Sequence, residues 1–562
     1  MLYRRAVRHR TIALSLSLLL GVGLVLGKPF LLPRDLPGRS GVDVLTQHND
    51  IGRTGATLHE TLLNTTDVNV KTFGKLFTRP VDGQIYAQPL YVSALHIPHK
   101  GTHNVVFVAT MHDSVYAFDA DEPAASTALW QVTLGASIPV TNADFGGRYG
   151  PYRDITVEIG IVSTPAIDRA TDTIYVLAAN RDSDGRYVHR LHALDLGTGA
   201  EKFGGPIETQ GSVPGRGVGS LDGMVTFDNK QQVQRAGLLL ANGLVYVAFA
   251  GYADTDPYHG WIFAYDAHSL QRKAIFNDTP NGGEGGIWQA GWGPAADASG
   301  HVYLATGNGD WDAGGGGTNY GDSFLKLSPT LTVDDWFTPW NQADLLDDQD
   351  LGATGLMLIP GPTGLMLIPG PHLLVSGDKQ GTLYLLKQDA MGHYNRHGDT
   401  QIVQRFQATK GPIHGGTVFW DGPTGDQVYV WSANDGLKAF RLSDGIFQTT
   451  PAAQSTMTIP PPGFPGSMLA LSANGSAAGS GIVWALCPYS GDASTGTALG
   501  ILRAFDASDV SKELWNSTQD AARDDVGSFA KFNTPTIANG KVYVPTFSGY
   551  LAVYGLLPPT RR

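Results

Sequence analysis

The chain has 562 residues, of which 16% are charged and 71 are glycine, and its formal net charge is −12. An acidic surface of this kind argues against nucleic acid or an anionic lipid surface as a partner. Cys487 is the only cysteine, so the sequence excludes an intrachain disulfide and a thiolate metal site.

The N-terminus has the features of an export signal. Four arginines within the first ten residues precede an apolar run, Ile12–Leu26, that is too short for a comfortable membrane span. We expect residues 1–27 to be a signal peptide or, because no clear cleavage site follows, an uncleaved anchor. The protein is therefore predicted to be secreted or extracytoplasmic, and to meet a membrane only through this segment.

A short β-hairpin pattern then recurs eight times. Its clearest copies are VYAFDA, LHALDL, IFAYDA and LRAFDA, at Val115–Ala120, Leu191–Leu196, Ile262–Ala267 and Leu502–Ala507. Apolar alternation that ends in Asp and then a turn residue is typical of a half-buried strand entering a turn. Eight copies in one chain indicate a repeat architecture.

The repeats run from Val42 to Tyr554, which gives about 64 residues per unit, enough for four strands and their loops. We predict an all-β, eight-bladed propeller over residues 73–558, preceded by an extended lead-in at 28–72; an open solenoid is the alternative. Phe73–Val81 is expected to be the outer strand that pairs with the C-terminal strands and closes the ring.

The nine residues TGLMLIPGP occur twice in succession, at Thr354–Pro362 and Thr363–Pro371. Either copy could supply the inner strand of the fifth unit. We expect the other copy to form a mobile loop, and the duplication to have no role of its own.

Acidic loops link the second and third strands of three consecutive units, at Asn180–Gly185, Asp254–Asp256 and Asn308–Asp312. In a propeller this link lies on the same face as the approach to the innermost strand. Alternating oxygen ligands can surround a hard cation such as calcium, so the loops predict a cation site, with ordinary surface turns as the alternative. They are not EF-hands, because Leu191 stands where the bidentate Glu would be.

The stretch Gly285–Gln388 resembles the quinoprotein dehydrogenases, eight-bladed propellers that hold pyrroloquinoline quinone (PQQ) and calcium. GGIWQAGWGPAADASGHVYLATGNGDWD is similar to the family's Gly-x-x-Trp, apolar strand and Thr-Gly-Asn. The resemblance implies that Trp288 stacks on the quinone and that Asn308 supplies an amide oxygen to calcium. Trp292 is a second candidate for the cofactor, and packing between blades is the alternative for both tryptophans.

Two further motifs extend the resemblance. DLLDDQDLG, at Asp344–Gly352, occupies the place of the family's catalytic Asp, which makes Asp348 or Asp350 the general base. DKQGTLYLLKQ, at Asp378–Gln388, makes Lys379 the cation that faces the quinone oxygens. A surface acidic loop and a solvated lysine are the alternatives.

The chain also departs from the family pattern. The single cysteine cannot form the disulfide ring that many alcohol-oxidising members carry above the cofactor. The family's calcium-binding Glu has no clear match. Asp182 and Asp184 are the nearest candidates, with Glu158 as another, and Asp310 is a further possible ligand beside Asn308.

The sequence thus predicts an exported PQQ- and calcium-dependent dehydrogenase that oxidises an alcohol or sugar. Because no C-x-x-C-H haem motif is present, electrons would pass to a separate carrier. Two other functions remain open. One is a non-catalytic propeller that binds a protein or glycan on its rim, supported by the incomplete ligand set; Thr46–Val70 is similar to the lead-in of PQQ-like repeat proteins generally, a superfamily that includes scaffolds without a cofactor. The other is a hydrolase or lyase that uses a channel cation. His414 is expected near the channel, with a core hydrogen bond as the alternative.

The inner strand of the second unit is expected at Ile161–Ile167. We expect the working face to lie over the arc from Asn180 to Lys379, and the units that end in VYAFDA and LRAFDA to be mostly scaffold.

Overall fold

The structure is a computed structural model that describes residues 42–141, 145–147, 150–346, 348–361, 372–459, 461 and 463–559. The described residues all fall in one compact unit, Gly41–Arg562. They form eight successive antiparallel sheets, each built around four strands, so the predicted all-β eight-bladed propeller is confirmed. In the described part of the chain, the helical elements are the short α1 (Ala521–Asp524) and two 3-10 turns, Ala313–Gly315 and Gln342–Asp344.

Each of the first four blades is built from four strands that follow one another along the chain. Their bounds are β3 Leu90–Ile97, β4 Gly101–Ala109, β5 Ser114–Asp119 and β6 Trp130–Thr133; β11 Ala166–Asp168, β12 Thr173–Arg181, β13 Tyr187–Asp195 and β14 Ile207–Glu208; β18 Leu239–Ala241, β19 Leu244–Gly251, β20 Trp261–Asp266 and β21 Arg272–Asn277; β22 Ala295–Ala296, β23 Val302–Ala305, β24 Phe324–Leu327 and β25 Val333–Phe337.

The last four blades follow the same plan. Their bounds are β26 Met357–Leu358, β27 Leu373–Gly377, β28 Thr382–Lys387 and β29 Gln404–Gln407; β30 Thr417–Gly422, β31 Gly425–Val430, β32 Gly436–Ser443 and β34 Ala453–Thr458; β35 Met468–Ser472, β36 Ile482–Ser490, β37 Leu499–Asp506 and β38 Glu513–Asn516; β39 Thr536–Ala538, β40 Lys541–Val544, β41 Tyr550–Leu556 and β2 Phe73–Pro80.

The remaining strands are short and are additional to the four strands of each blade. They are β1 Ala56–Thr57, β7 Ile138–Pro139, β8 Gly146–Gly147, β9 Gly150–Pro151, β10 Glu158–Ile159, β15 Ser212–Pro214, β16 Met224–Thr226, β17 Gln232–Val233 and β33 Ile446–Phe447. The first strands of neighbouring blades contact one another in succession, for example β11 with β18, β18 with β22, and β39 with β3. These first strands therefore form the inner wall of the ring.

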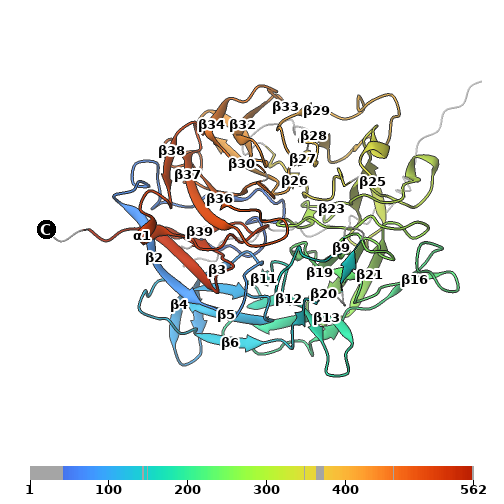
Figure 1. Cartoon of the computed structure of the whole chain (residues 1–562), viewed down its shortest axis with the longest axis horizontal. Coiled ribbons are helices and arrows are strands. Elements are labelled where there is room, and N and C mark those ends of the chain that lie inside the picture. Colours follow the sequence, from blue (N-terminus) through green and yellow to red (C-terminus); the bar gives the residue numbers. More distant parts are fainter. Residues whose placement is uncertain are drawn as a thin grey trace, which may run out of the picture. The chain divides into compact units, whose positions relative to one another are not determined.

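The ring closes through the N-terminal strand β2. It pairs antiparallel with β41, from Phe73 opposite Leu556 to Pro80 opposite Tyr550. In Figure 1 the blue β2 lies beside the red C-terminal strands. The predicted closing strand is confirmed, and both strands lose an exposed edge by this pairing. A second N-terminal strand, β1, runs parallel to β35 and joins the seventh blade.

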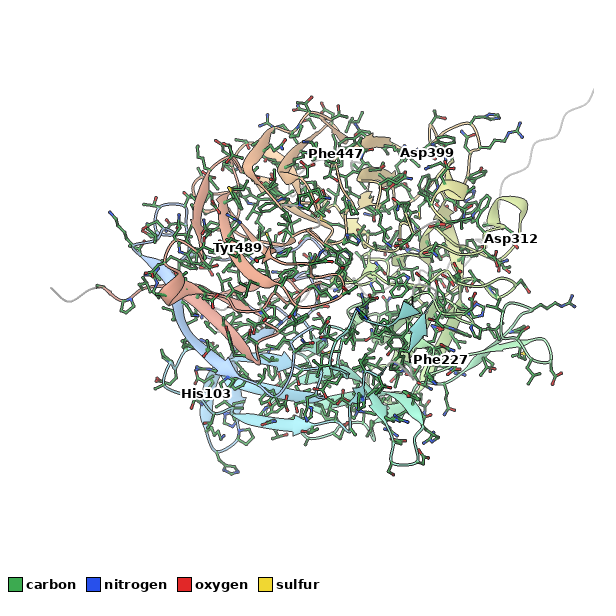
Figure 2. All side chains as sticks on the ribbon, in the orientation of Figure 1. His103, Phe227, Asp312, Asp399, Phe447 and Tyr489 are labelled. Atoms are coloured by element: carbon green, nitrogen blue, oxygen red, sulfur yellow. The ribbon has the colours of Figure 1, made fainter. Side chains whose placement is uncertain are left out.

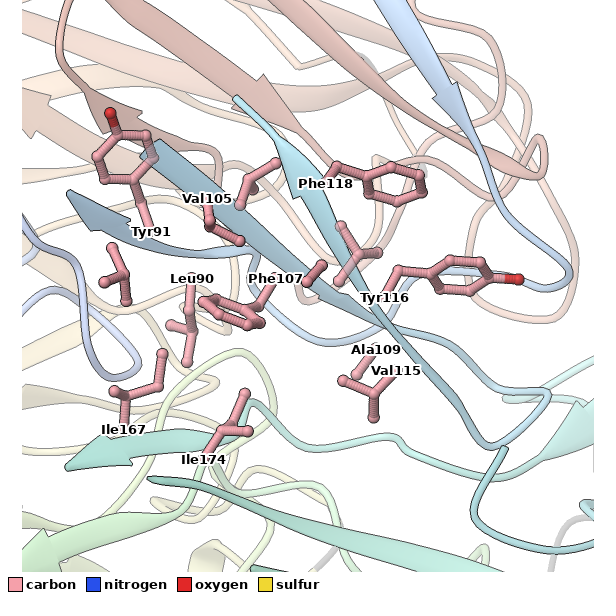
Figure 3. Close-up of a cluster of buried hydrophobic side chains, with 14 of the residues drawn as sticks. Leu90, Tyr91, Val105, Phe107, Ala109, Val115, Tyr116, Phe118, Ile167 and Ile174 are labelled. Atoms are coloured by element: carbon pink, nitrogen blue, oxygen red, sulfur yellow. The ribbon is translucent and has the colours of Figure 1, made fainter. Parts of the chain in front are cut away.

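The hairpin pattern folds as expected because its apolar residues are buried against the next blade. Figure 3 shows one such core, in which Leu90 and Phe107 of the first blade approach Ile167 and Ile174 of the second. All four side chains are less than 5% exposed. Burial of side chains of this size contributes about 1.5–3 kcal/mol each, so contacts between blades stabilise the ring.

The lead-in segment is anchored to the inner wall through Arg53. Its guanidinium is fully buried and donates hydrogen bonds to Thr46 and to the backbone oxygens of Gln47, Leu238 and Pro294. Leu238 and Pro294 directly precede the inner strands β18 and β22. These hydrogen bonds attach the lead-in segment to the inner wall of the ring.

The first copy of the duplicated segment supplies the inner strand β26, which pairs with β27. Gly355 of this copy lies against the indole of Trp292, where a Cβ atom would stand only 1.7 Å from Cδ1. This close approach explains the glycine. The second copy, which we expected to be a mobile loop, lies outside the described residues.

No helix in the described part of the chain is both long enough and apolar enough to cross a membrane. The predicted signal or anchor, residues 1–27, lies outside the described residues.

Candidate active site

A cavity of about 810 Å³ lies at the centre of one face. Its wall comes from links between second and third strands, such as Asp254 between β19 and β20, and from approaches to inner strands, such as Trp288 before β22. This is the face on which the sequence placed the functional loops. Side chains fill the blades around it, and Asp312 lies at the margin of the view in Figure 2.

Trp288 forms an aromatic part of the cavity wall. Its half-buried indole lies against two glycines: a Cβ atom on Gly286 would stand 2.8 Å from Nε1, and one on Gly307 would stand 3.0 Å from Cδ1. The absence of side chains at these positions lets the indole lie close to the backbone. The ring can therefore serve as a supported platform for a planar ligand.

Lys379 joins two carboxylates in the same wall. Its Nζ is 3.3 Å from Oδ2 of Asp350 and also contacts Oδ1 of Asp348. Burial alone would lower the pKa of Lys379, but the two carboxylates outweigh it and raise the pKa above its ordinary value. The Asp350 side chain is 2% exposed and that of Asp348 is 52% exposed. The structure thus brings together three of the residues singled out from the sequence.

Asp254 adds a third carboxyl group to this wall. Its pKa is raised to about 6, mainly by burial and also by the charges of Asp348 and Asp350. The hydroxyl of Tyr258, which donates to Oδ1 at 2.9 Å, opposes the rise. Sequence analysis placed Asp254 in an acidic loop but did not select it as a site residue. Only the spatial proximity of the three aspartates distinguishes it from other loop carboxylates.

Asn308 lies behind the cavity wall and is 2% exposed. Its Nδ2 donates to Oε2 of Glu284 at 2.9 Å, whereas its buried Oδ1 accepts no hydrogen bond from any described residue. Next to this group, Asp322 is fully buried, and burial followed by the charge of Asp350 raises its pKa well above the ordinary value. An unsatisfied amide oxygen among carboxyl groups is suited to a hard cation.

Trp292 has a different environment from Trp288. It is 1% exposed, its Nε1 donates to the Leu356 oxygen at 3.2 Å, and its ring centroid is 3.8 Å from that of His48. It does not line the large cavity, although it borders a very small void nearby. In this structure it packs between inner segments.

The other predicted metal ligands stand apart from the cavity. Asp182 forms two 2.8 Å hydrogen bonds with Arg190, and Asp184, whose side chain is 60% exposed, is 3.1 Å from Nε of Arg186. Asp310 accepts a 3.0 Å hydrogen bond from the backbone of Gly283. Asp182 and Asp184 are thus paired with arginines, whereas Asp310, two residues from Asn308, has its carboxylate bonded to the backbone beside Glu284.

Glu158, the further candidate, also lies away from the cavity and is 3.0 Å from Nδ1 of His112. His414 does reach the cavity, as its position in the sequence predicted. Burial, followed by the positive charge of Lys379, lowers the pKa of His414 to about 3. Its ring is therefore neutral at physiological pH.

The opposite wall comes from blades that we expected to be scaffold. Phe464, Lys531 and Phe532 line it. Arg235, from the third blade, lies between this wall and Trp288, because its guanidinium carbon is 5.8 Å from the Trp288 ring centroid and 5.3 Å from that of Phe532. No local sequence motif distinguishes these residues, because each belongs to an ordinary segment that leads to an inner strand. Their role is set by the convergence of all the blades on one axis.

The site fits a planar quinone and a hard cation in the chemistry of its groups. It offers the Trp288 platform, the cation Lys379 and the unsatisfied oxygen of Asn308. Among the described residues, no three His, Cys, Asp or Glu side chains converge as a complete metal site. A bound cation would therefore take ligands from Asn308 and from the cofactor as well as from carboxylates.

No protein-family model matches the sequence. No curated protein matches it either. Solved structures match nearly the whole chain. A europium-containing methanol dehydrogenase is 15% identical, with a TM-score of 0.51 over 92% of this chain and 98% of its own.

Two quinohemoprotein alcohol dehydrogenases match in the same way. The protein from Comamonas testosteroni is 14% identical, with a TM-score of 0.52 over 93% of this chain and 81% of its own. The protein ADHIIG from Pseudomonas putida HK5 is 13% identical, with a TM-score of 0.52 over 92% of this chain and 82% of its own. The chain has the fold of the quinoprotein alcohol dehydrogenases. The resemblance first noted over Gly285–Gln388 thus extends, as a fold, over the whole ring.

Proposed function

We propose that the protein is a PQQ- and calcium-dependent dehydrogenase that oxidises an alcohol or sugar hydroxyl. The observation that carries this proposal is the meeting of Trp288, Asp350 and Lys379 in one central cavity. These residues come from three separate segments and were chosen from the sequence by their resemblance to the quinoproteins. The shared fold supports the proposal but does not by itself establish activity.

Bound PQQ would supply the oxidant, by taking up the hydride, with its two electrons, from the hydroxyl-bearing carbon. Trp288 supports the planar ring from one side. Asp350 takes the hydroxyl proton as the carbonyl group of the product forms, which is general-base catalysis. Lys379 balances the charge of Asp350 and holds its carboxylate in place through the 3.3 Å contact.

Two groups prepare the environment for this step. Phe464 and Phe532 line the cavity and exclude water from part of it, which strengthens the electrostatic interactions inside. Asn308 directs an unsatisfied amide oxygen, and Asp254 a carboxyl group, to the region where calcium would bind. Asp254, whose pKa is raised to about 6, is ionised at pH 7 and would be available as a carboxylate ligand for the cation.

The proposal also includes the cell compartment and the electron acceptor. The arginine-rich, apolar N-terminus supports export, with or without a retained anchor. The absence of a C-x-x-C-H motif means that a separate carrier would receive the electrons.

The test is a dye-linked assay of the purified protein after incubation with PQQ and calcium, using primary alcohols and aldoses. Asp350→Asn should lower kcat by at least about a hundredfold, because a general base contributes about 10²–10⁴ to the rate. Asp444→Asn, at an exposed surface position, is the control and should leave the rate unchanged. Wild-type protein that binds PQQ without reducing the dye, or that does not bind it, would contradict the proposal and favour the non-catalytic propeller.

A further inference from the structure

Arg235 contributes a buried positive charge to the cavity wall, and nearby negative groups compensate this charge only weakly. The residue is 9% exposed, and its Nε has no hydrogen-bond partner among the described residues. Its Nη2 is 3.5 Å from the hydroxyl of Tyr152 and 3.9 Å from Oδ2 of Asp154, whose side chain is 42% exposed. Its guanidinium carbon also lies 5.8 Å from the ring centroid of Trp288 and 5.3 Å from that of Phe532. A guanidinium can donate five hydrogen bonds, so most of its hydrogen-bonding capacity is unused.

Lys531 places a second cation in the same wall. It is 1% exposed, and its Nζ donates to the backbone oxygens of Ala493 and Ser494, each at 2.8 Å. No acidic side chain among the described residues lies within ion-pair distance of it. Burial, followed by the charge of Arg235, lowers the pKa of Lys531 to about 7 against the opposing effect of Asp154 and Asp492.

The contrast with Lys379 shows that the cavity is polarised. Lys379 faces two carboxylates, with Asp254 nearby, so its wall is acidic overall. The wall of Arg235 and Lys531 has one loosely held carboxylate for two cations. A buried charge without a partner is costly, so this wall is suited to an anionic group of a ligand.

We propose that Arg235 and Lys531 form a subsite for a carboxylate of the substrate, so that the alcohol oxidised here is a hydroxy acid or a sugar acid. Its hydroxyl would face Asp350 on the acidic wall while its carboxylate binds the basic wall. Guanidinium and ammonium groups form short, charge-assisted hydrogen bonds with carboxylates. This inference deepens the proposed dehydrogenase function and, for the reaction, rests on it.

The position of Lys531 favours the substrate over the cofactor as the source of the carboxylate. Lys531 is bonded to the loop between β36 and β37, whose exposed Thr495 also lines the cavity. That loop reaches solvent. Arg235, by contrast, stands 5.8 Å from the ring of Trp288 and can reach either ligand, so Lys531 decides between them. A substrate that enters from solvent would meet Lys531 near this loop.

Calorimetric titration of the full chain with gluconate and with glucose tests the proposal, with and without PQQ and calcium. Gluconate should bind at least about tenfold more tightly than glucose, since charge-assisted bonds contribute about 1.5–3 kcal/mol. Lys531→Met should abolish this preference. Thr495→Asp, at an exposed position, should weaken gluconate binding by supplying a competing carboxylate, and it provides a second test if Lys531→Met does not fold.

Lys512→Met is the matched control, because the Lys512 side chain is 64% exposed and lies outside the cavity. Equal affinity for gluconate and glucose would overturn the subsite. Loss of PQQ affinity in Lys531→Met, with gluconate binding unchanged, would overturn it too, because the subsite would then hold the cofactor. Preferred binding of gluconate without its oxidation by the loaded protein would support the subsite and refute the dehydrogenase function.

Discussion

Asp254 holds its proton at a higher pH than an ordinary carboxyl group does. Its pKa is raised from 3.8 to about 6, first by burial and then by Asp348 and Asp350, against the opposing hydrogen bond from Tyr258. The folded protein therefore binds this proton more tightly than the unfolded chain does. The stability that the protonated group contributes is complete below about pH 4 and is lost as the pH rises through about 6.

Asp254→Asn should therefore stabilise the protein at pH 7.5 in calcium-free buffer and have little effect at pH 4. The gain should reach up to about 3 kcal/mol, since two pKa units correspond to roughly that free energy. Urea denaturation at the two pH values measures it. Asp256→Asn, at an exposed position of the same loop, should show no such pH-dependent gain; an equal gain in both variants would refute burial of Asp254 as the cause.

At this scale, the sequence predicts the residues whose chemistry is marked by a local motif. Trp288, Asp350 and Lys379 stand in such motifs, and the structure places all three at the cavity. Arg235 and Lys531 have no motif, because their importance arises from neighbours far away in the chain. A single arginine or lysine before a strand is a common sequence feature. It becomes distinctive only in the folded ring, where the side chain is buried with few acidic groups nearby.

At the scale of elements, β2 shows how one strand closes the molecule. Phe73, at its start, is fully buried, with ring centroids 4.9 Å from Trp515 and 5.4 Å from Trp484. Arg79, near its end, is also buried and donates to the backbone oxygens of Asp119 and Glu122. The closing strand thus holds the seventh, eighth and first blades together.

Phe73→Ala should lower the free energy of unfolding by about 3–5 kcal/mol, as expected when a buried aromatic side chain is truncated. Thr78→Ala, at an exposed position of the same strand, is the control and should change it by less than about 0.5 kcal/mol. Chemical denaturation followed by tryptophan fluorescence compares the two variants. Similar small losses in both would mean that β2 is not part of the cooperative core.

The hairpins were predictable because alternation and turn residues are local signals. Inner strands were less so: Ile161–Ile167 was expected to be the inner strand of the second blade, whereas β11 is Ala166–Asp168. The chain before β11 instead contacts the first blade, where the backbone N–H of Ile161 donates to the Thr110 oxygen at 3.4 Å and Gly160 lies against the Met111 oxygen. The choice between the two TGLMLIPGP copies was equally undetermined, because their local signals are identical.

At the scale of the whole molecule, ring closure decides what the site contains. The sequence placed the working arc between Asn180 and Lys379, where the acidic loops and quinoprotein-like residues lie. The acidic wall does belong to that arc, but Phe464, Lys531 and Phe532 come from the blades on the far side. In the closed ring, the segments that lead to the inner strands converge on the central axis from every blade. Blades that we expected to be scaffold therefore also contribute residues to the cavity wall.

The central claim is that this cavity holds a quinone against Trp288, and equilibrium binding of PQQ in the presence of calcium tests it most directly. Wild-type protein should bind one PQQ at micromolar concentration or below. Trp288→Ala should weaken binding at least about tenfold, because aromatic stacking contributes about 0.5–1.5 kcal/mol beyond the area it buries. Trp340→Ala, at an exposed position outside the cavity, should bind like the wild type. Absence of saturable PQQ binding, or equal binding by Trp288→Ala and the wild type, would contradict the claim.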